Sequence, residues 1–551
     1  MASDSASVDA ASGVQETQFT APIDEAEELS LDSQAAEQPE PPPLRPYANN
    51  GPNYNTFNDT ASGTIDNPVN DDVAMQKAPR ALVPSRSLAP DLLRGLLMII
   101  MAIDHCAVSQ GAWRHGVALE GESDGTIVDT WNDPVAWVAR MSTHLCAPGF
   151  MFLLGMGIVY FGTSRSKLGW SSREMAQHFA IRALVLAAVN ELVFTVMLGG
   201  KFLILNPILL ALAIDYLLAG LIWLGINASE KALSTMLETS YDSPDDDTRG
   251  LLLQGETGSP CKSSVSAWAL RCSWHIHNAF LLILTLITVA WNHWLSPHQG
   301  HCPGNVMAGH SGPTQPTGTS LGPWFDFWFL PVTNKLVASP FPPLGWLSPA
   351  ILGLLYGRIV LSRHWRNYII IAGNALIGVS FMVLFVLTRL LHFGNLSEDC
   401  LRMPEQITSP KKNQYLVSFR SFFYIIKYPP SFAFVALTMS INFLLLGLFG
   451  SLPEKYARRI PALLTFGRSA LFFYIAHLIF YFSVGSLVKR WFGHDLGYVN
   501  PWEGKPAIGT RGKPAVMWIT WALGLLILWP LCRWYARFKS TKNVNSVWRF
   551  F

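Results

Sequence analysis

Charged residues are scarce in this chain. Only 14% of its 551 residues are Asp, Glu, Lys or Arg, whereas a soluble domain contains about 25%. Basic and acidic residues nearly balance, at 40 and 38, and this balance disfavours a nucleic-acid binder or a partner of acidic macromolecules. Seven cysteines are too few for a disulfide-rich scaffold. A Walker phosphate loop, a GxSxG turn and a GxGxxG motif in a strand–helix context are also lacking, which removes the commonest nucleotide and hydrolase signatures.

Apolar residues, by contrast, are abundant. They make up 50% of the chain, with 20 Trp and 32 Phe. A helix needs about 20 residues to cross the hydrocarbon core, and apolar segments of that length recur from residue 90 onward. The sequence therefore predicts an all-α, polytopic membrane helical bundle of about ten transmembrane helices. We place these at 90–110, 135–160, 178–199, 202–225, 271–294, 343–361, 367–392, 431–452, 461–488 and 515–535.

Residues 1–86 differ from the rest. They hold 14 acidic and 4 basic residues, a net charge of −10, and include the proline cluster PEPPPLRP. Such a segment cannot bury enough apolar area to offset its ordering entropy, so we expect a disordered acidic N-terminal tail. The expected organisation is this cytosolic tail, a transmembrane domain at 87–540 and a short cytosolic C-terminal tail at 541–551.

Loop charges predict the orientation. Basic residues concentrate in loops that face the cytosol if the N-terminus is cytosolic, as the positive-inside rule requires. These are Arg165, Lys167, Arg173, Arg358, Arg363, Arg366, Lys455, Arg458 and Arg459. We therefore expect both termini in the cytosol, in an endomembrane of lysosome or vacuole type or in the plasma membrane. On this topology 226–270 is a flexible cytosolic linker, and Cys302 and Cys400 lie on the outer side, where an oxidising lumen would allow a disulfide.

Ionisable groups inside the spans are functional candidates because they are costly in hydrocarbon. At about 1.5 Å of rise per residue, Asp104, His105, His144 and His477 all fall in the outer half of their spans. They converge on one layer if the first, second and ninth helices are neighbours. The adjacent Asp104 and His105 suit general-base catalysis, since a carboxylate raises the basicity of an imidazole and orients its ring.

Plainer interpretations fit some of these residues equally well. A lone histidine in a membrane is often only an interhelical hydrogen-bonding group, and this applies to His144 and His477. Asp91 and Arg94 are three residues apart and suit a simple ion pair at a helix start. Arg468 and Lys427 suit side chains that extend toward the membrane interface.

Five blocks carry a resemblance to a known family. RSLAPDLLRGLLMIIMAIDH (86–105) resembles the opening helix of the heparan-alpha-glucosaminide N-acetyltransferase catalytic-domain family of transmembrane acyltransferases. THLCAPGFMFLLG (143–155) resembles the second-helix motif of its bacterial and fungal branch. FPPLGW (341–346), KYPPS (427–431) and FGRSALFFYIAH (466–477) resemble later signatures. The blocks follow in the family's order and cover about 86–485.

The resemblance implies transfer of an acetyl or other acyl group from cytosolic acyl-CoA to an amine or hydroxyl, usually on a sugar, across the membrane. Acyl transfer from a thioester needs a base or a nucleophile, and His105, Asp104, His144 and His477 are the candidates for this role. The resemblance adds His115, the nearest counterpart of a lumenal histidine used by the lysosomal member. Acyl-CoA phosphates need cations, and Arg94, Arg468, Asp91 and Lys427 are the residues expected around the co-substrate. No metal is predicted.

Three other functions stay open. A secondary transporter or permease would use Asp104, Glu191, Asp215 and the histidines as a relay. A separate family of polysaccharide-modifying membrane acyltransferases shares an Arg…His pattern in its first helix, although KYPPS and THLCAP argue against it. A scaffold or sensor would use the acidic tail to bind a partner. The expected partners are the lipid bilayer, acyl-CoA and a small acceptor, with no nucleic acid, and a homodimer is one assembly left open.

Overall fold

The computed structural model describes residues 87–119, 121–198, 204–241, 260–297, 299–302, 322–334, 337–500, 505–542 and 548. The predicted tail 1–86 and most of the tail 541–551 lie outside these ranges. The described part contains ten helical segments long and apolar enough to cross a membrane, which confirms the all-α membrane bundle. They are α1 (Ala89–Gln110), α2 with α3 (Pro134–Thr143 and Cys146–Lys167), α4 (Ser172–Leu198), α5 (Leu209–Tyr241), α6 (Pro260–Trp294), α8 (Pro343–Leu361), α9 (Asn367–Leu391), α12 (Phe432–Ser451), α15 (Ala470–Phe492) and α16 (Pro514–Ser540).

Shorter elements lie between the spanning helices. The helices are α7 (Pro323–Phe329), α10 (Pro404–Ile407), η1 (Gln414–Leu416), α11 (Phe419–Phe423), α13 (Glu454–Ala457) and α14 (Pro461–Arg468). In one sheet β3 (Val337–Ser339) pairs in parallel with β1 (Ile204–Leu205) and antiparallel with β2 (Val332–Thr333). In the other, β4 (His494–Asn500) and β5 (Lys505–Gly509) form an antiparallel hairpin.

Two predicted spans are interrupted. The second breaks between α2 and α3, at His144 and Leu145. Pro148 explains this break, because it has no N–H to donate to the carbonyl four residues earlier, that of His144. The ninth breaks at Ser469, whose φ and ψ of −112° and 35° are not helical, so α14 and α15 are separate helices. Both breaks lie within segments that carry candidate residues.

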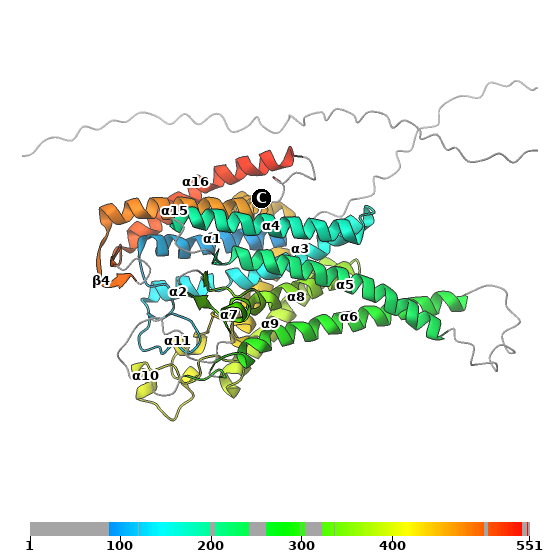
Figure 1. Ribbon diagram of the computed structural model, residues 1–551, viewed down its shortest axis with the longest axis horizontal. Coiled ribbons are helices and arrows are strands. Elements are labelled where there is room, and N and C mark those ends of the chain that lie inside the picture. The colour runs from blue at the N-terminus through cyan, green and yellow to red at the C-terminus, as the bar shows by residue number, and fades with distance from the viewer. Residues whose placement is uncertain are drawn as a thin grey trace, which may run out of the picture. The chain divides into compact units, whose positions relative to one another are not determined.

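Helix α1 lies at the centre of the site-bearing helices. It contacts α2, α3, α12, α14, α15 and α16, and Figure 1 shows it beside α15, α2 and α3. Two glycines allow α14 to approach it closely. A Cβ at Gly95 would lie 2.0 Å from the Leu463 carbonyl oxygen, and one at Gly467 would lie 1.9 Å from that of Asp91. Such small residues are how membrane helices bring their backbones together.

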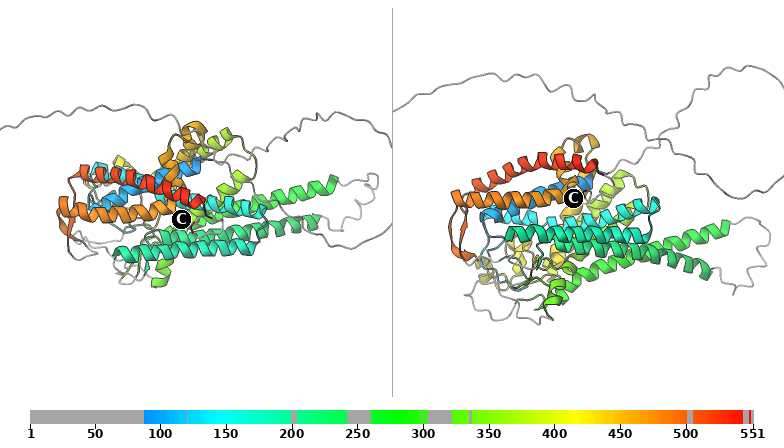
Figure 2. Two further views of the ribbon diagram at one scale, coloured as in Figure 1. Left: turned by 90° about the horizontal axis from the view of Figure 1, so that it is seen from above. Right: turned by 45° about the horizontal axis from the view of Figure 1, so that its top comes forward.

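Helices α5 and α6 are longer than predicted. They contain 33 and 35 residues, about 50 Å each, and run side by side past the other helices (Figures 1 and 2). The prediction of a linker over 226–270 was therefore wrong for most of that segment, and 242–259 lies outside the described residues. The run after 226 is polar but rich in Ala, Leu, Met, Glu and Lys, which favour helix.

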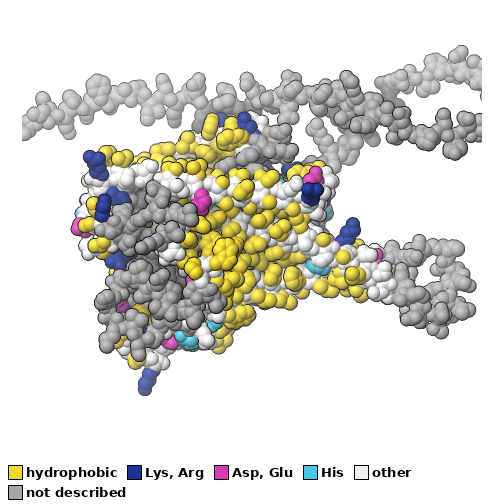
Figure 3. All heavy atoms as spheres, viewed as in Figure 1, with side chains coloured by type: hydrophobic (Ala, Val, Ile, Leu, Met, Phe, Trp, Pro, Cys, Tyr) yellow, Lys and Arg dark blue, Asp and Glu magenta, His cyan; other side chains and the backbone are white. Residues whose placement is uncertain are grey.

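The outer surface fits a bilayer. On the face shown in Figure 3, hydrophobic side chains cover the middle and charged side chains lie toward its edges. Large apolar side chains are exposed on several spanning helices, including Leu184, Leu286, Leu376 and Leu526. The chain is thus an integral multi-pass membrane protein. Cys302 and Cys400 are joined in a disulfide with a Cα–Cα distance of 5.1 Å, which confirms the predicted pairing.

Candidate functional site

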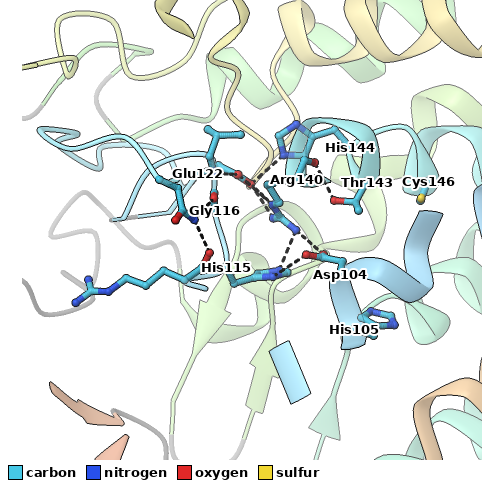
Figure 4. Close-up of polar contacts among 12 residues, drawn as sticks. Asp104, His105, His115, Gly116, Glu122, Arg140, Thr143, His144 and Cys146 are labelled. Carbon is cyan, nitrogen blue, oxygen red and sulfur yellow. Dashed lines mark hydrogen bonds and ion pairs between the residues drawn. The ribbon is translucent and has the colours of Figure 1, made fainter. Parts of the chain in front are cut away.

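A buried guanidinium organises one end of α1. Arg140 on α2 is only 1% exposed, and its Nη1 donates to Asp104 Oδ2 at 2.7 Å and to His115 Nε2 at 3.0 Å. Its Nε and Nη2 donate to the Glu122 carboxylate, with the shortest contact at 2.7 Å. His144 Nε2 lies 3.1 Å from the same carboxylate. Figure 4 shows Arg140 between Glu122 and His144 on one side and Asp104 and His115 on the other. We call these five residues the Arg140 cluster.

Glu122 connects the loop after α1 to the rest of this cluster. Besides Arg140 and His144, its carboxylate accepts from the backbone N–H of Val117 at 2.9 Å. Its backbone carbonyl accepts from the N–H groups of Lys427 at 3.1 Å and Tyr428 at 3.2 Å. Burial alone would raise its pKa, but the charges of Arg140 and His144 hold the pKa of this carboxyl well below its usual range. Glu122 is therefore an ionised carboxylate that connects the loop after α1 to α2 and to the segment that contains Lys427.

Sequence reasoning did not identify Glu122. It lies in a loop that contains several acids, and nothing in its spacing marks it out. The residue that could have indicated Glu122 is Arg140. A guanidinium cannot lose its proton, so an arginine inside a predicted span needs buried acceptors, of which a carboxylate forms the strongest bond. Asp104 is one carboxylate partner of Arg140, and Glu122, which accepts two hydrogen bonds from the guanidinium, is the other.

The hydrogen bonds fix the tautomer of His115. Arg140 can only donate, so His115 Nε2 is the acceptor and carries no proton. In the neutral ring the proton is then on Nδ1, which lies 3.2 Å from Asp104 Oδ1. The His115 side chain is 42% exposed, so it forms the accessible edge of the cluster. Its basic nitrogen is occupied by Arg140.

Asp104 does not orient His105, as the adjacent pair had suggested. Successive helical residues point in different directions, and the Asp104 carboxylate binds Arg140 and His115 instead (Figure 4). His105 Nδ1 lies 2.7 Å from Nε2 of His477 on α15. The predicted convergence of α1 and α15 is thus correct, although the partner of His105 is a second imidazole.

This histidine pair, His105 and His477, also has defined tautomers. His477 Nδ1 lies 2.9 Å from the Phe473 carbonyl oxygen, which can only accept, so that nitrogen carries the proton. His477 Nε2 is then the acceptor, and His105 Nδ1 is the donor. The remaining nitrogen of neutral His105, Nε2, therefore holds a lone pair. Within the described residues it has no hydrogen-bond partner, and the side chain is partly exposed.

The opposite end of α1 carries a different group, the Asp91 cluster. Arg94 Nη1 lies 3.1 Å from Asp91 Oδ1, which confirms the predicted ion pair, and Arg468 Nε lies 3.9 Å from Asp91 Oδ2. The arginine side chains are 24% and 49% exposed. Asp91 and Asp104 are 13 positions apart, about 20 Å along the helix. Lys427, grouped with these cations in the sequence analysis, lies instead at the Asp104 end.

Two acids expected in a transport relay are not part of either cluster. Glu191 on α4 accepts from Asn190, and Asn190 also donates to the Leu205 carbonyl at 2.6 Å. Asp215 on α5 is fully buried, and neither carboxyl oxygen has a hydrogen-bond partner in the described part of the chain. No contact among the described residues joins either acid to Asp104.

Comparison with known proteins adds no assignment, since neither family models nor curated proteins match this chain. The chemistry of the site therefore depends on its own geometry. That geometry provides a buried, hydrogen-bonded cluster, a neighbouring imidazole with an available lone pair, and a separate pair of partly exposed arginines.

Proposed function

We propose that the protein is a membrane-bound acyltransferase that moves an acetyl or other acyl group from acyl-CoA to an amine or hydroxyl acceptor, such as a sugar. The observation that carries this proposal is the histidine pair. Because the Phe473 carbonyl and His477 fix its ring, His105 presents an unprotonated Nε2. A positioned imidazole of this kind is the commonest general base in proteins.

The reaction follows from that lone pair. His105 Nε2 takes the proton of the acceptor N–H or O–H as the acceptor atom attacks the thioester carbonyl carbon. A tetrahedral oxyanion forms, the carbon–sulfur bond breaks, and the proton passes from His105 to the departing CoA sulfur. The Asp104 carboxylate, held by Arg140, lies one residue away and stabilises the transient imidazolium by its negative charge.

The Asp91 cluster supports a site for the donor. Arg94 and Arg468 are partly exposed, and guanidinium groups bind phosphate through paired hydrogen bonds. With this end in the cytosol, the CoA phosphates bind there and the flexible arm of CoA extends along α1 toward His105. The disulfide near the Arg140 end favours that orientation, because disulfides persist on the lumenal or extracellular side.

The family resemblance supports the same reaction class. The segments that resemble family motifs supply His105, His144, Lys427 and His477. His105 contacts His477, and His144 and Lys427 both contact Glu122. We propose on this basis that the chain is a member of the heparan-alpha-glucosaminide N-acetyltransferase catalytic-domain family. The acceptor need not be heparan sulfate.

A secondary transporter is the second candidate, and Asp215 favours it. A buried carboxyl without a partner is a typical proton-carrying group in a membrane. It lies on α5, apart from the histidines.

One reconstitution experiment separates the two functions. The full chain is placed in liposomes with ¹⁴C-acetyl-CoA on one side and a panel of amino sugars, sugars and polyols on the other. The acyltransferase predicts labelled acceptor that forms only with acetyl-CoA. Acceptor flux that is independent of acetyl-CoA, without labelled product, would contradict it and favour the transporter.

A further inference from the structure

Lys427 is a buried residue whose ammonium has no polar partner among the residues that the structure describes. Its residue is 6% exposed, and its backbone is fixed by the hydrogen bond from its N–H to the Glu122 carbonyl. The ammonium lies 5.5 Å from the ring centroid of Phe341 and 5.2 Å from that of Tyr428. Throughout the described residues it makes neither a hydrogen bond nor an ion pair. The sequence expectation of a side chain reaching the membrane interface does not fit this burial.

Such an arrangement leaves donors available. An ammonium has three N–H donors and no acceptor, and aromatic faces offset only part of the cost of removing it from water. The nearby carboxylates do not neutralise it directly, since Asp104 and Glu122 are both bound to Arg140. Lys427 therefore adds a positive charge beside the two carboxylates at this end of α1.

The position of Lys427 relates it to the proposed base. Its backbone N–H donates to the Glu122 carbonyl, Glu122 binds Arg140, and Arg140 binds Asp104, the residue that precedes His105. Lys427 and the proposed base His105 therefore belong to the same end of α1. An oxygen atom of a bound ligand would satisfy the ammonium donors of Lys427.

We propose that Lys427 binds the carbonyl oxygen of the acyl group and stabilises the oxyanion of the tetrahedral intermediate. This inference rests on the proposed acyltransferase function. As the acceptor attacks, the carbonyl π electrons move to oxygen, and that oxygen accepts hydrogen bonds from the ammonium. As the carbon–sulfur bond breaks, the carbonyl re-forms and Lys427 keeps its proton throughout. A preformed donor that strengthens its bond only in the transition state raises kcat.

The kinetic test uses three variants of the full chain in liposomes. Removal of one oxyanion donor typically lowers kcat by about 10²–10³, so Lys427→Met should lose that factor while the KM for acetyl-CoA changes little. Lys427→Arg should recover part of the loss, since it retains the positive charge. Lys411→Met, an exposed lysine at the same end, is the matched control and should keep wild-type kcat.

A binding test does not depend on turnover. The probes are CoA and a ketone analogue of acetyl-CoA, which has the carbonyl but no thioester to cleave. Wild type should bind the ketone about tenfold more tightly than it binds CoA. Lys427→Met should bind the two probes with equal affinity, and its affinity for CoA should equal that of wild type. If Lys427→Met does not fold, as judged by thermal unfolding in detergent, Lys427→Gln replaces it.

The outcomes separate the two claims. Wild-type kcat and an unchanged ketone preference in Lys427→Met, in an enzyme that transfers acetyl groups, would overturn the role of Lys427 alone. Failure of the wild type to bind CoA and to transfer acetyl groups would overturn the acyltransferase, and the role of Lys427 with it. An equal loss of CoA and ketone affinity in Lys427→Met would show a charge that only maintains the site, which also contradicts the proposal.

Discussion

The two ends of α1 hold charged residues in opposite ways. At one end Asp104 is bound to a fully buried guanidinium, which also holds Glu122. At the other end Asp91 is buried, but its partners Arg94 and Arg468 are partly exposed. A buried network fixes positions and tautomers, whereas exposed cations remain available to a soluble anion. On the proposed function, the first end would carry catalysis and the second would bind the acyl-CoA donor.

Removal of Arg140 should have the largest effect on stability. Arg140→Met leaves Asp104 and Glu122 as uncompensated buried carboxylates, and breaking a buried pair in this way costs about 3–5 kcal/mol. Arg458→Met is the matched control, because its ion pair with Glu454 is exposed and such pairs are worth about 0–1 kcal/mol. Denaturant unfolding in detergent measures both. An equal loss of unfolding free energy in Arg140→Met and Arg458→Met would contradict the distinction between buried and exposed ion pairs.

The disulfide should give the next largest effect. It closes a loop between positions 98 residues apart, and loss of such a crosslink typically costs about 2–5 kcal/mol. Cys302→Ser should lower the free energy of unfolding by that amount. Cys272→Ser, at a free cysteine, should leave it nearly unchanged. Peptide mapping without reductant should find Cys302 joined to Cys400, and free thiols at both positions would contradict the pairing.

Acid should destabilise the Arg140 end through Glu122. The pKa of this carboxyl is held below its usual range by Arg140 and His144, despite burial. Its contribution to stability is therefore complete above the unfolded pKa, about 4.3, and is lost as pH falls from about 5 toward the folded pKa. Glu122→Gln should be less stable than wild type at pH 7, and the difference should narrow below pH 5. A difference that does not change with pH would show that Glu122 is not the responsible group.

Substitutions in the Asp91 cluster should give the smallest effect on activity. Arg468 is half-exposed, and one exposed ion pair is worth about 1 kcal/mol or less. Arg468→Ala should therefore raise the KM for acetyl-CoA about two- to fivefold and leave kcat nearly unchanged. Arg402→Ala, exposed at the Arg140 end, is the control for general loss of charge. A large fall in kcat with unchanged KM would assign Arg468 to the chemistry instead.

Hydropathy predicted the spans because a membrane helix must satisfy its own backbone over a fixed length. It could not place the breaks at His144 and Ser469, because a window of spanning length averages over the few polar residues there. It also ended α5 too early, because a helix continues into water wherever its residues favour helix.

The residues of the site were easier to find than their partners. Intramembrane titratable groups identified Asp104, His105, His144 and His477 from sequence alone. The contact between His105 and His477 joins positions 372 residues apart, and no local spacing encodes it. Glu122 was missed because its importance arises only when the loop after α1 folds onto α2 and the segment that contains Lys427.

Acetyl transfer by His105→Ala tests the central claim most directly. The variant is reconstituted with labelled acetyl-CoA and an acceptor that the wild type uses, and folding is checked by thermal unfolding. His301→Ala, an exposed histidine, is the control. Loss of a general base lowers the rate by about 10²–10⁴, so the account predicts a reduction of that size in His105→Ala and none in His301→Ala. Full activity in folded His105→Ala would contradict it.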